Sequence, residues 1–298
     1  MTTPAPRPWA HVTLSTLLDP FARPVRTTPL ARRLSALVLP ARAAGLTEDT
    51  TRAASVGDAR LLAGVRAEIG GAHAVQRDRT TCGSATLVVL AALGDPALER
   101  WIADGTRPAG ARPEIPDDAE TAALAGDGLT LNSPERRFDA AQRIVKRRTS
   151  RRALAIADWP DRLGTPPWAA ARVARFPGVR YRWTPVDDRS ERGAQVLAAV
   201  HSATLAGVPV PLYTSGDLGG GLGVAVPRHV VLALPAVDRG SGRGVDDSGA
   251  PVLTIYEPSR GLDHQVPVAD LLARSVPLKA LGSWSHVAWA LLPVPATR

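Results

Sequence analysis

The chain has very little cysteine and almost no lysine. Its one cysteine is Cys82, and its only lysines are Lys146 and Lys279. A single cysteine excludes an intrachain disulfide, which suits a reducing compartment. Without a second cysteine, and with histidines that share no metal-type spacing, a zinc site is not expected. We therefore expect neither a metal nor another cofactor.

Long apolar runs are also absent. No window approaches the roughly 18 uninterrupted apolar residues that a membrane-spanning helix requires. The first residues lack the apolar core of a signal peptide, because Pro4, Pro6, Arg7 and Pro8 interrupt it. We expect a cytoplasmic protein without a membrane partner, with non-classical export as the open alternative.

Positive charge exceeds negative charge, with a net charge of +8 and a pI near 10.7. Nearly all of it is arginine, scattered from end to end, so a nucleic-acid partner is not favoured. The one dense cluster runs from Arg143 to Arg152, and we interpret it as a solvated helix face in preference to a phosphate-binding patch. A basic surface could equally attract an acidic protein substrate.

What is present is enough for a folded core. The chain has 298 residues and a hydrophobic fraction of 45%, which is ordinary for globular proteins. We expect residues 1–70 to form an extension, irregular up to about residue 28 and then helical over Leu30 to Leu39 and Asp58 to Ile69. Residues 71–298 are expected to form the main domain.

Within that domain, helical spacing comes early and strand-like runs come late. Ser133-Pro134 predicts the start of a helix over about 135–149, whereas Gly105 to Gly128 is interpreted as a loop. Later runs predict further elements: a helix over Arg192 to Ala206, and strands over Val179 to Val186, Val208 to Tyr213, Val252 to Tyr256 and Trp284 to Leu292. This order predicts an α+β fold, in which a helical lobe packs on an antiparallel sheet.

The most informative stretch surrounds Cys82. Thr80 or Thr81 can cap a helix whose first turn carries Cys82 and which ends at Gly94. A thiol at a helix N-terminus lies near unpaired N–H groups and the positive end of the macrodipole, which favour the thiolate. Gln76 lies six residues upstream. We expect its amide and the Cys82 N–H to bind a developing oxyanion.

A thiolate nucleophile also needs a base and a group that orients the base. His229 lies in an aliphatic strand, and Glu257 ends the next one. Cys82 and His229 are 147 positions apart (229 minus 82), within the roughly 130–150 of papain-type enzymes. We expect the Cys82 sulfur within about 4 Å of a His229 ring nitrogen. Asp263 and Asp238 remain alternative orienting groups.

Four short motifs together resemble papain-like cysteine peptidases, most closely the bacterial group related to bacteriocin-processing (double-glycine leader) peptidases. They are Gln76-x-Asp78-x-x-x-Cys82-Gly83, Gly207-Val208-Pro209-Val210, Arg228-His229-Val230-Val231 and Glu257-Pro258. The resemblance covers about residues 71–298. It departs from the family pattern at Arg228, where the family has glycine, and at Glu257, where it has aspartate.

The resemblance implies a papain-like fold and a cysteine-dependent hydrolase that cleaves peptide or isopeptide bonds of a protein or peptide substrate. Cys82 would be the nucleophile, His229 the acid–base group, Glu257 its orienting carboxylate and Gln76 an oxyanion donor. A thioester-forming transferase, a glutamine deamidase and a non-catalytic adaptor remain open alternatives. The glycine-rich run Ser215 to Gly223 precedes the His229 strand, and we expect it to act as a lid.

Overall fold

The computed structural model of the chain describes residues 13, 15–16, 64–151, 153, 158–160, 164–217, 227, 229–236, 244–246 and 248–296. The expected helix at Leu30 to Leu39 lies outside these residues, as does nearly all of the segment expected to be irregular. Of the expected lid, only residues 215–217 are described. These expectations therefore stay predictions.

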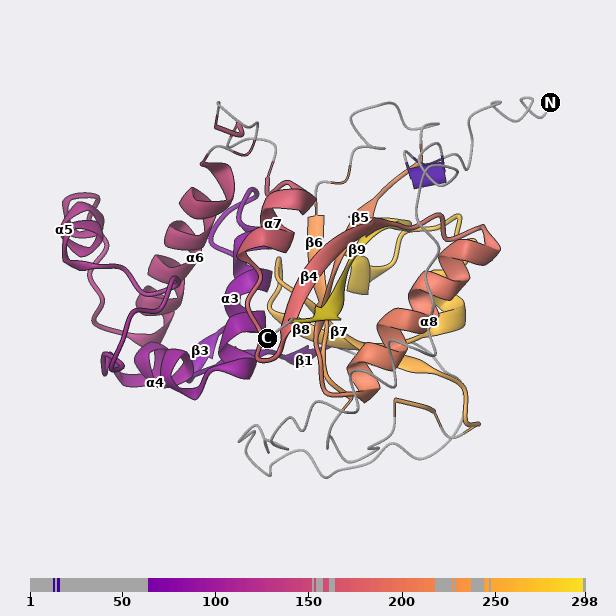
Figure 1. Ribbon diagram of the computed structural model, residues 1–298, viewed down its shortest axis with the longest axis horizontal. Coiled ribbons are helices and arrows are strands. Elements are labelled where there is room, and N and C mark those ends of the chain that lie inside the picture. The colour runs from indigo at the N-terminus through magenta and orange to yellow at the C-terminus, as the bar shows by residue number, and fades with distance from the viewer. Residues whose placement is uncertain are drawn as a thin grey trace, which may run out of the picture.

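An antiparallel sheet forms the centre of the described molecule (Figure 1). Its seven strands lie in the order β1-β8-β7-β6-β5-β9-β4. Their bounds are Val65–Arg66 for β1, Val179–Pro185 for β4, Val210–Ser215 for β5, His229–Ala233 for β6, Val252–Glu257 for β7, Leu262–Pro267 for β8 and His286–Pro295 for β9. The strands β2 (Glu68–Ile69) and β3 (Ala72–His73) form a separate hairpin.

The helices divide between the two sides of this sheet. In Figure 1 the helices that precede β4 in the chain gather on one side, and α8 (Glu191–Leu205) lies on the other. The first group consists of α3 (Cys82–Gly94), α4 (Pro96–Asp104), α5 (Asp118–Gly126), α6 (Pro134–Ser150) and α7 (Pro167–Val173). Two 3-10 turns follow late in the chain, η4 (Val268–Leu271) and η5 (Lys279–Leu281).

Helix α3 is the buried centre of the helical side. Every residue from Cys82 to Ala92 is buried, because α3 lies between α6 and strand β6 and contacts both. Its run of alanine, leucine and valine leaves no polar face, as expected for a helix enclosed by protein. The helix ends where Asp95 accepts a hydrogen bond from Ala97 N (3.1 Å) and so caps α4.

The α+β class is confirmed, and the helix predicted after Ser133 forms with Ser133 as its cap. Two local predictions were wrong. The described part of the helix expected at Asp58 to Ile69 is strand, because β1 pairs with β8 and β2 with β3. The expected loop Gly105 to Gly128 contains α5, which a capping box between Asp117 and Glu120 starts.

No single helix in the described residues is long and apolar enough to cross a membrane. The pair α3 and α4 reaches that length and composition together, but the two helices are bent by 114° at their junction.

Candidate active site

Cys82 is the first residue of α3, and its side chain is 1% exposed. The capping expected of the threonine hydroxyl is absent, since Thr81 makes no side-chain cap hydrogen bond. Instead, Thr81 Oγ1 accepts from Asp78 N (2.9 Å) and donates to Asp78 O (3.1 Å). This compact turn fixes the backbone that leads into Cys82.

His229 begins strand β6 and is hydrogen-bonded to the Cys82 side chain. Its Nε2 atom lies 2.8 Å from Glu257 Oε1. Because Nε2 binds the carboxylate, Nδ1 is the ring nitrogen left for the thiol. The structure thus brings Cys82, His229 and Glu257 into one chain of hydrogen bonds.

Glu257 is the last residue of β7, next to β6 in the sheet, so it reaches the imidazole from a neighbouring strand. Its side chain is 1% exposed. Its oxygens accept from Ser259 N (2.7 Å), Ser259 Oγ (2.7 Å) and Arg260 N (3.2 Å). The structure describes two of the acidic residues proposed to orient His229, Glu257 and Asp263. Glu257 hydrogen-bonds to His229, whereas Asp263 belongs to β8 and pairs there with Tyr256 of β7. Asp238 lies outside the described residues.

The proton distribution favours a charged pair. Burial alone would raise the pKa of the Cys82 thiol, but the hydrogen bond and the charge of His229, with the N–H groups of Val230 and Gly83, lower that pKa below its usual value. Burial opposes a charged imidazole, yet Cys82 and Glu257 raise the pKa of His229 to about 9. Both shifts favour a thiolate beside an imidazolium over a neutral pair.

Gln76 lies in the loop before Cys82, but its amide is directed into its own loop. Gln76 Nε2 donates to Asp78 O (2.7 Å), while Oε1 is buried and has no hydrogen-bond partner among the described residues. Its backbone N–H donates to Pro258 O (2.7 Å), directly after Glu257. The loop before Cys82 is thus tied to the turn that follows Glu257. Hydrogen bonding of an oxyanion by Gln76 stays a prediction.

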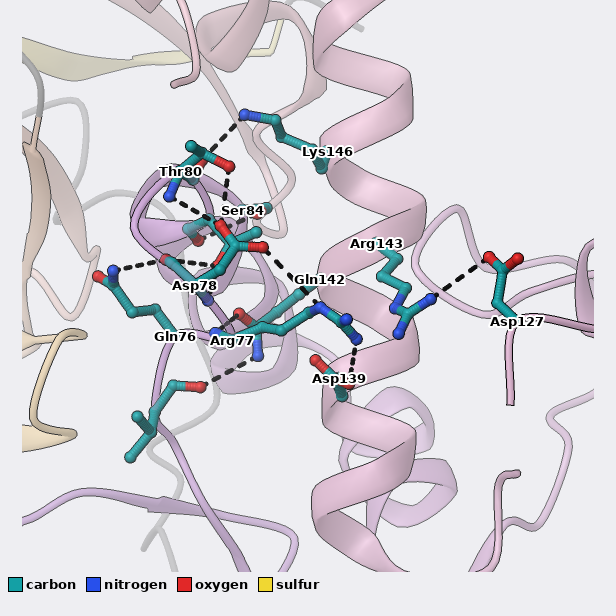
Figure 2. A network of polar contacts seen from close by, with 12 residues as sticks. Gln76, Arg77, Asp78, Thr80, Ser84, Asp127, Asp139, Gln142, Arg143 and Lys146 are labelled. Atoms are coloured by element: carbon teal, nitrogen blue, oxygen red, sulfur yellow. Dashed lines mark hydrogen bonds and ion pairs between the residues drawn. The ribbon is translucent and has the colours of Figure 1, made fainter. Parts of the chain in front are cut away.

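Helix α6 holds the same loop from the opposite side (Figure 2). Gln142 Oε1 accepts from Arg77 N (2.9 Å), and its Nε2 donates to Val75 O (3.1 Å). Arg77 Nη1 lies 2.8 Å from Asp139 Oδ2, and Lys146 Nζ donates to Thr80 O (2.9 Å). One polar stripe of α6 therefore fixes the backbone between residues 75 and 80.

This stripe corrects part of the interpretation of Arg143 to Arg152 as a solvated face. Lys146 is only 8% exposed and Thr149 is fully buried. Asp139, Gln142 and Lys146 follow helical spacing, so they share one side of α6. That spacing was visible in the sequence, but only the fold shows that this side meets the loop before Cys82.

Gly282 is a second contributor that the sequence pattern did not indicate. It has φ +68°, and a Cβ atom added to it would lie 2.5 Å from His229 Nε2. Its backbone therefore lies directly against the imidazole ring. The turn that carries it is held where Thr214 Oγ1 donates to Leu281 O (3.0 Å). No local motif marks this contact, because it joins residues far apart in the chain.

Among the described residues, no group of three or more His, Cys, Asp or Glu side chains is arranged to hold a metal ion. Comparison of the chain with protein-family models, with curated proteins and with solved structures gives no match. The geometry of the site is therefore the basis on which a function is inferred.

Proposed function

We propose that the chain is a thiol-dependent acyl-transfer enzyme. The observation that carries this proposal is the buried chain of hydrogen bonds from Cys82 through His229 to Glu257. A nucleophile, its base and an orienting group within mutual hydrogen-bond reach form the arrangement that covalent catalysis requires. The lowered pKa of Cys82 and the raised pKa of His229 support the same roles.

Within that class, we propose a papain-like cysteine peptidase that hydrolyses peptide or isopeptide bonds. The Cys82 thiolate attacks the amide carbonyl carbon and forms a tetrahedral intermediate. The His229 imidazolium gives its proton to the leaving amine, and a thioester forms. His229 then takes a proton from water, which attacks the thioester and releases the acid and the free thiolate. Glu257 accepts the Nε2–H bond and stabilises the imidazolium throughout.

The developing oxyanion needs donors close to Cys82. We propose the amide of Gln76 and the backbone N–H of Cys82 for this role. The Gln76 amide carries two hydrogens, of which one is used by Asp78 O. Removing one such donor lowers turnover by about 10²–10³ in comparable sites.

The three alternatives differ from the peptidase in the product that forms or in the reactivity of the Cys82 thiol. A transferase joins the acyl group to an amine, a deamidase converts glutamine to glutamate, and an adaptor makes no product. Incubation with a mixed peptide library followed by mass spectrometry distinguishes new termini, crosslinks and amide-to-acid conversion. New termini that vanish in Cys82→Ala support the peptidase. If only crosslinks or deamidated glutamines appear, acyl transfer stands and hydrolysis of the peptide bond does not.

The carboxylate provides a second, independent check. Glu257→Gln keeps the shape but removes the charge that favours imidazolium, so we expect turnover to fall at least tenfold with substrate affinity nearly unchanged. Glu257→Asp keeps the charge with shorter reach and should retain more activity. Equal turnover for wild type and Glu257→Gln would remove Glu257 from the mechanism.

A further inference from the structure

A hollow of about 310 Å³ lies beside the loop that leads into Cys82. Its walls come from this loop, from the end of α5 and from α6 (Figure 2). Thr80 and Thr81 line it, and Thr81 directly precedes Cys82. Neighbouring Cα atoms are about 3.8 Å apart, so the backbone of this wall lies within two residue lengths of the Cys82 backbone.

Basic side chains dominate the lining. The lining contains four basic side chains, those of Arg77, Arg143, Lys146 and Arg147. It contains two carboxylates, those of Asp78 and Asp127. The hollow therefore carries net positive charge, and its volume, at the lower end of the range of ligand sites, suits a single side chain.

Arg143 and Arg147 are the two arginines of α6 in the lining, and nearby carboxylates neutralise them only weakly. Arg143 Nη1 is 3.5 Å from Asp127 Oδ2, and the Asp127 side chain is 70% exposed, so this ion pair is long and well solvated. Arg143 Nε is buried and has no hydrogen-bond partner among the described residues. Arg147 is exposed and makes no ion pair with any other residue that the structure describes. A guanidinium in this state favours a planar anion that accepts two parallel hydrogen bonds.

The basic part of the lining is held in a fixed position. Lys146 is 8% exposed, and its Nζ donates to Thr80 O (2.9 Å). The backbone of the loop is fixed by Gln142, which is 1% exposed. The cationic surface and the nucleophile therefore share one rigid support, which is what a specificity pocket needs.

We propose that this hollow is a substrate subsite for the carboxylate of an aspartate or glutamate side chain, within two residues of the bond that Cys82 attacks. The proposal rests on the proposed function and names its substrate class, an acidic peptide. Arg143 and Arg147 bind the carboxylate, and Lys146 contributes positive charge at the rim next to Thr80.

The test uses affinity reagents that alkylate Cys82, so it needs no knowledge of the natural substrate. Bromoacetyl-Glu-amide and bromoacetyl-Gly-Glu-amide are compared with their glutamine counterparts on the full chain, and alkylation of Cys82 is followed by mass spectrometry. The sulfur displaces bromide, and the matched reagents differ only in charge. At least one glutamate reagent should react about tenfold faster than its glutamine partner, as expected of a charge-assisted hydrogen bond.

Two variants locate the effect. Arg143→Gln with Arg147→Gln should reduce the ratio of the rates to within about twofold. Arg136→Gln is the matched control, because Arg136 is an exposed arginine of α6 that is absent from the lining. It should leave the ratio unchanged. Equal melting temperatures for the variants show that folding is not the cause.

The remaining outcomes are each decisive. Equal rates for the glutamate and glutamine reagents at both lengths would overturn the subsite while leaving a reactive Cys82 and the proposed function intact. Loss of the ratio in Arg136→Gln as well would replace the subsite by a diffuse basic field. A phosphoserine reagent provides a further comparison. If its rate exceeds that of the glutamate reagent by a much larger factor than separates glutamate from glutamine, the subsite is built for phosphate, contrary to the proposal. A Cys82 that reacts only as an ordinary thiol would remove the proposed function itself.

Discussion

At the scale of single residues, the candidate site depends on where one proton lies. Cys82 and His229 are both buried, and burial disfavours both charges. Each charge nevertheless stabilises the other, and Glu257 lies on the far nitrogen of the ring. The pair therefore holds its charges in a place from which water is largely excluded, which strengthens their interaction.

This charge distribution predicts the pH dependence. The pKa of Cys82 is lowered, so alkylation by iodoacetamide should already be fast below pH 8.5, the value expected of an ordinary thiol. The pKa of His229 is raised to about 9, so turnover, which needs the imidazolium, should fall as the pH rises through about 9. Together they give a bell-shaped turnover profile. Alkylation that rises only near pH 8.5–9 would contradict the ion pair.

Gly282 makes a prediction that involves no titrating group. A methyl group on Gly282 would overlap the His229 ring, so Gly282→Ala should displace the imidazole. We expect at least tenfold lower turnover and a Cys82 pKa shifted toward that of a free thiol. The measurement is the pH profile of alkylation together with the rate of product formation.

Gly71→Ala is the matched control for this change. Gly71 has φ +77°, so alanine there suffers the same backbone strain, of roughly 1–2 kcal/mol, but nothing lies within 4 Å of its added Cβ. If Gly71→Ala and Gly282→Ala alter the thiol equally, backbone strain explains the effect and contact with His229 does not.

At the scale of elements, the site forms where α3 meets β6. Cys82 and Thr86 lie one turn apart on the same face of α3. Thr86 Oγ1 donates to Val230 O (3.1 Å), and the Val230 N–H reaches the Cys82 sulfur. Val230, which follows His229, thus contacts two successive turns of α3 and fixes the position of this helix along β6.

Thr86→Val tests this arrangement, because it keeps the shape and removes the hydroxyl. We expect the free energy of unfolding to fall by about 1 kcal/mol and the pKa of Cys82 to rise. Thr149→Val is the control, since Thr149 is also buried but donates within its own helix to Lys146 O (2.9 Å). A rise in the pKa of Cys82 in the control alone, or in neither variant, would show that Thr86 does not set the helix position.

Predictability from sequence followed the range of the interactions. The start of α6 at Ser133-Pro134 and the strand β7 depend on neighbouring residues, and both were predicted. Strand β1 pairs with β8, and β8 pairs along its length with β7, so both depend on partners elsewhere in the chain. Their short sequences carry little local signal, so β1 was mistaken for helix and β8 was missed. The nucleophile, base and carboxylate could be proposed from residue type and order, whereas the contacts of Gly282 and Lys146 required the fold.

At the scale of the whole molecule, the helical side supplies Cys82 and the sheet supplies His229 and Glu257. The two sides are joined near the site by the hydrogen bond from Gln76 N to Pro258 O. The α3–β6 interface and this link therefore determine together how Cys82 lies relative to His229 and Glu257. Residues before the expected boundary at residue 70 contribute to the same assembly, because β1 pairs with β8 and Ala67 N donates to Gly261 O (2.8 Å).

The domain boundary expected at residue 70 stays untested, and a pair of truncated chains can test it. We compare a chain that begins at Gly64 with one that begins at Gly71. The shorter chain loses β1 and the buried side chains of Ala67 and Ile69, each 7% exposed. Burying an isoleucine contributes about 1.5–3 kcal/mol, so the free energy of unfolding of the shorter chain should be lower by at least that amount.

The truncation should also affect the thiol. Gly261 contacts the segment before Gln76, since His73 Nε2 lies 3.1 Å from Gly261 O. We therefore expect slower alkylation of Cys82 in the shorter chain. Equal denaturant midpoints and equal alkylation rates would show instead that the domain begins at residue 71.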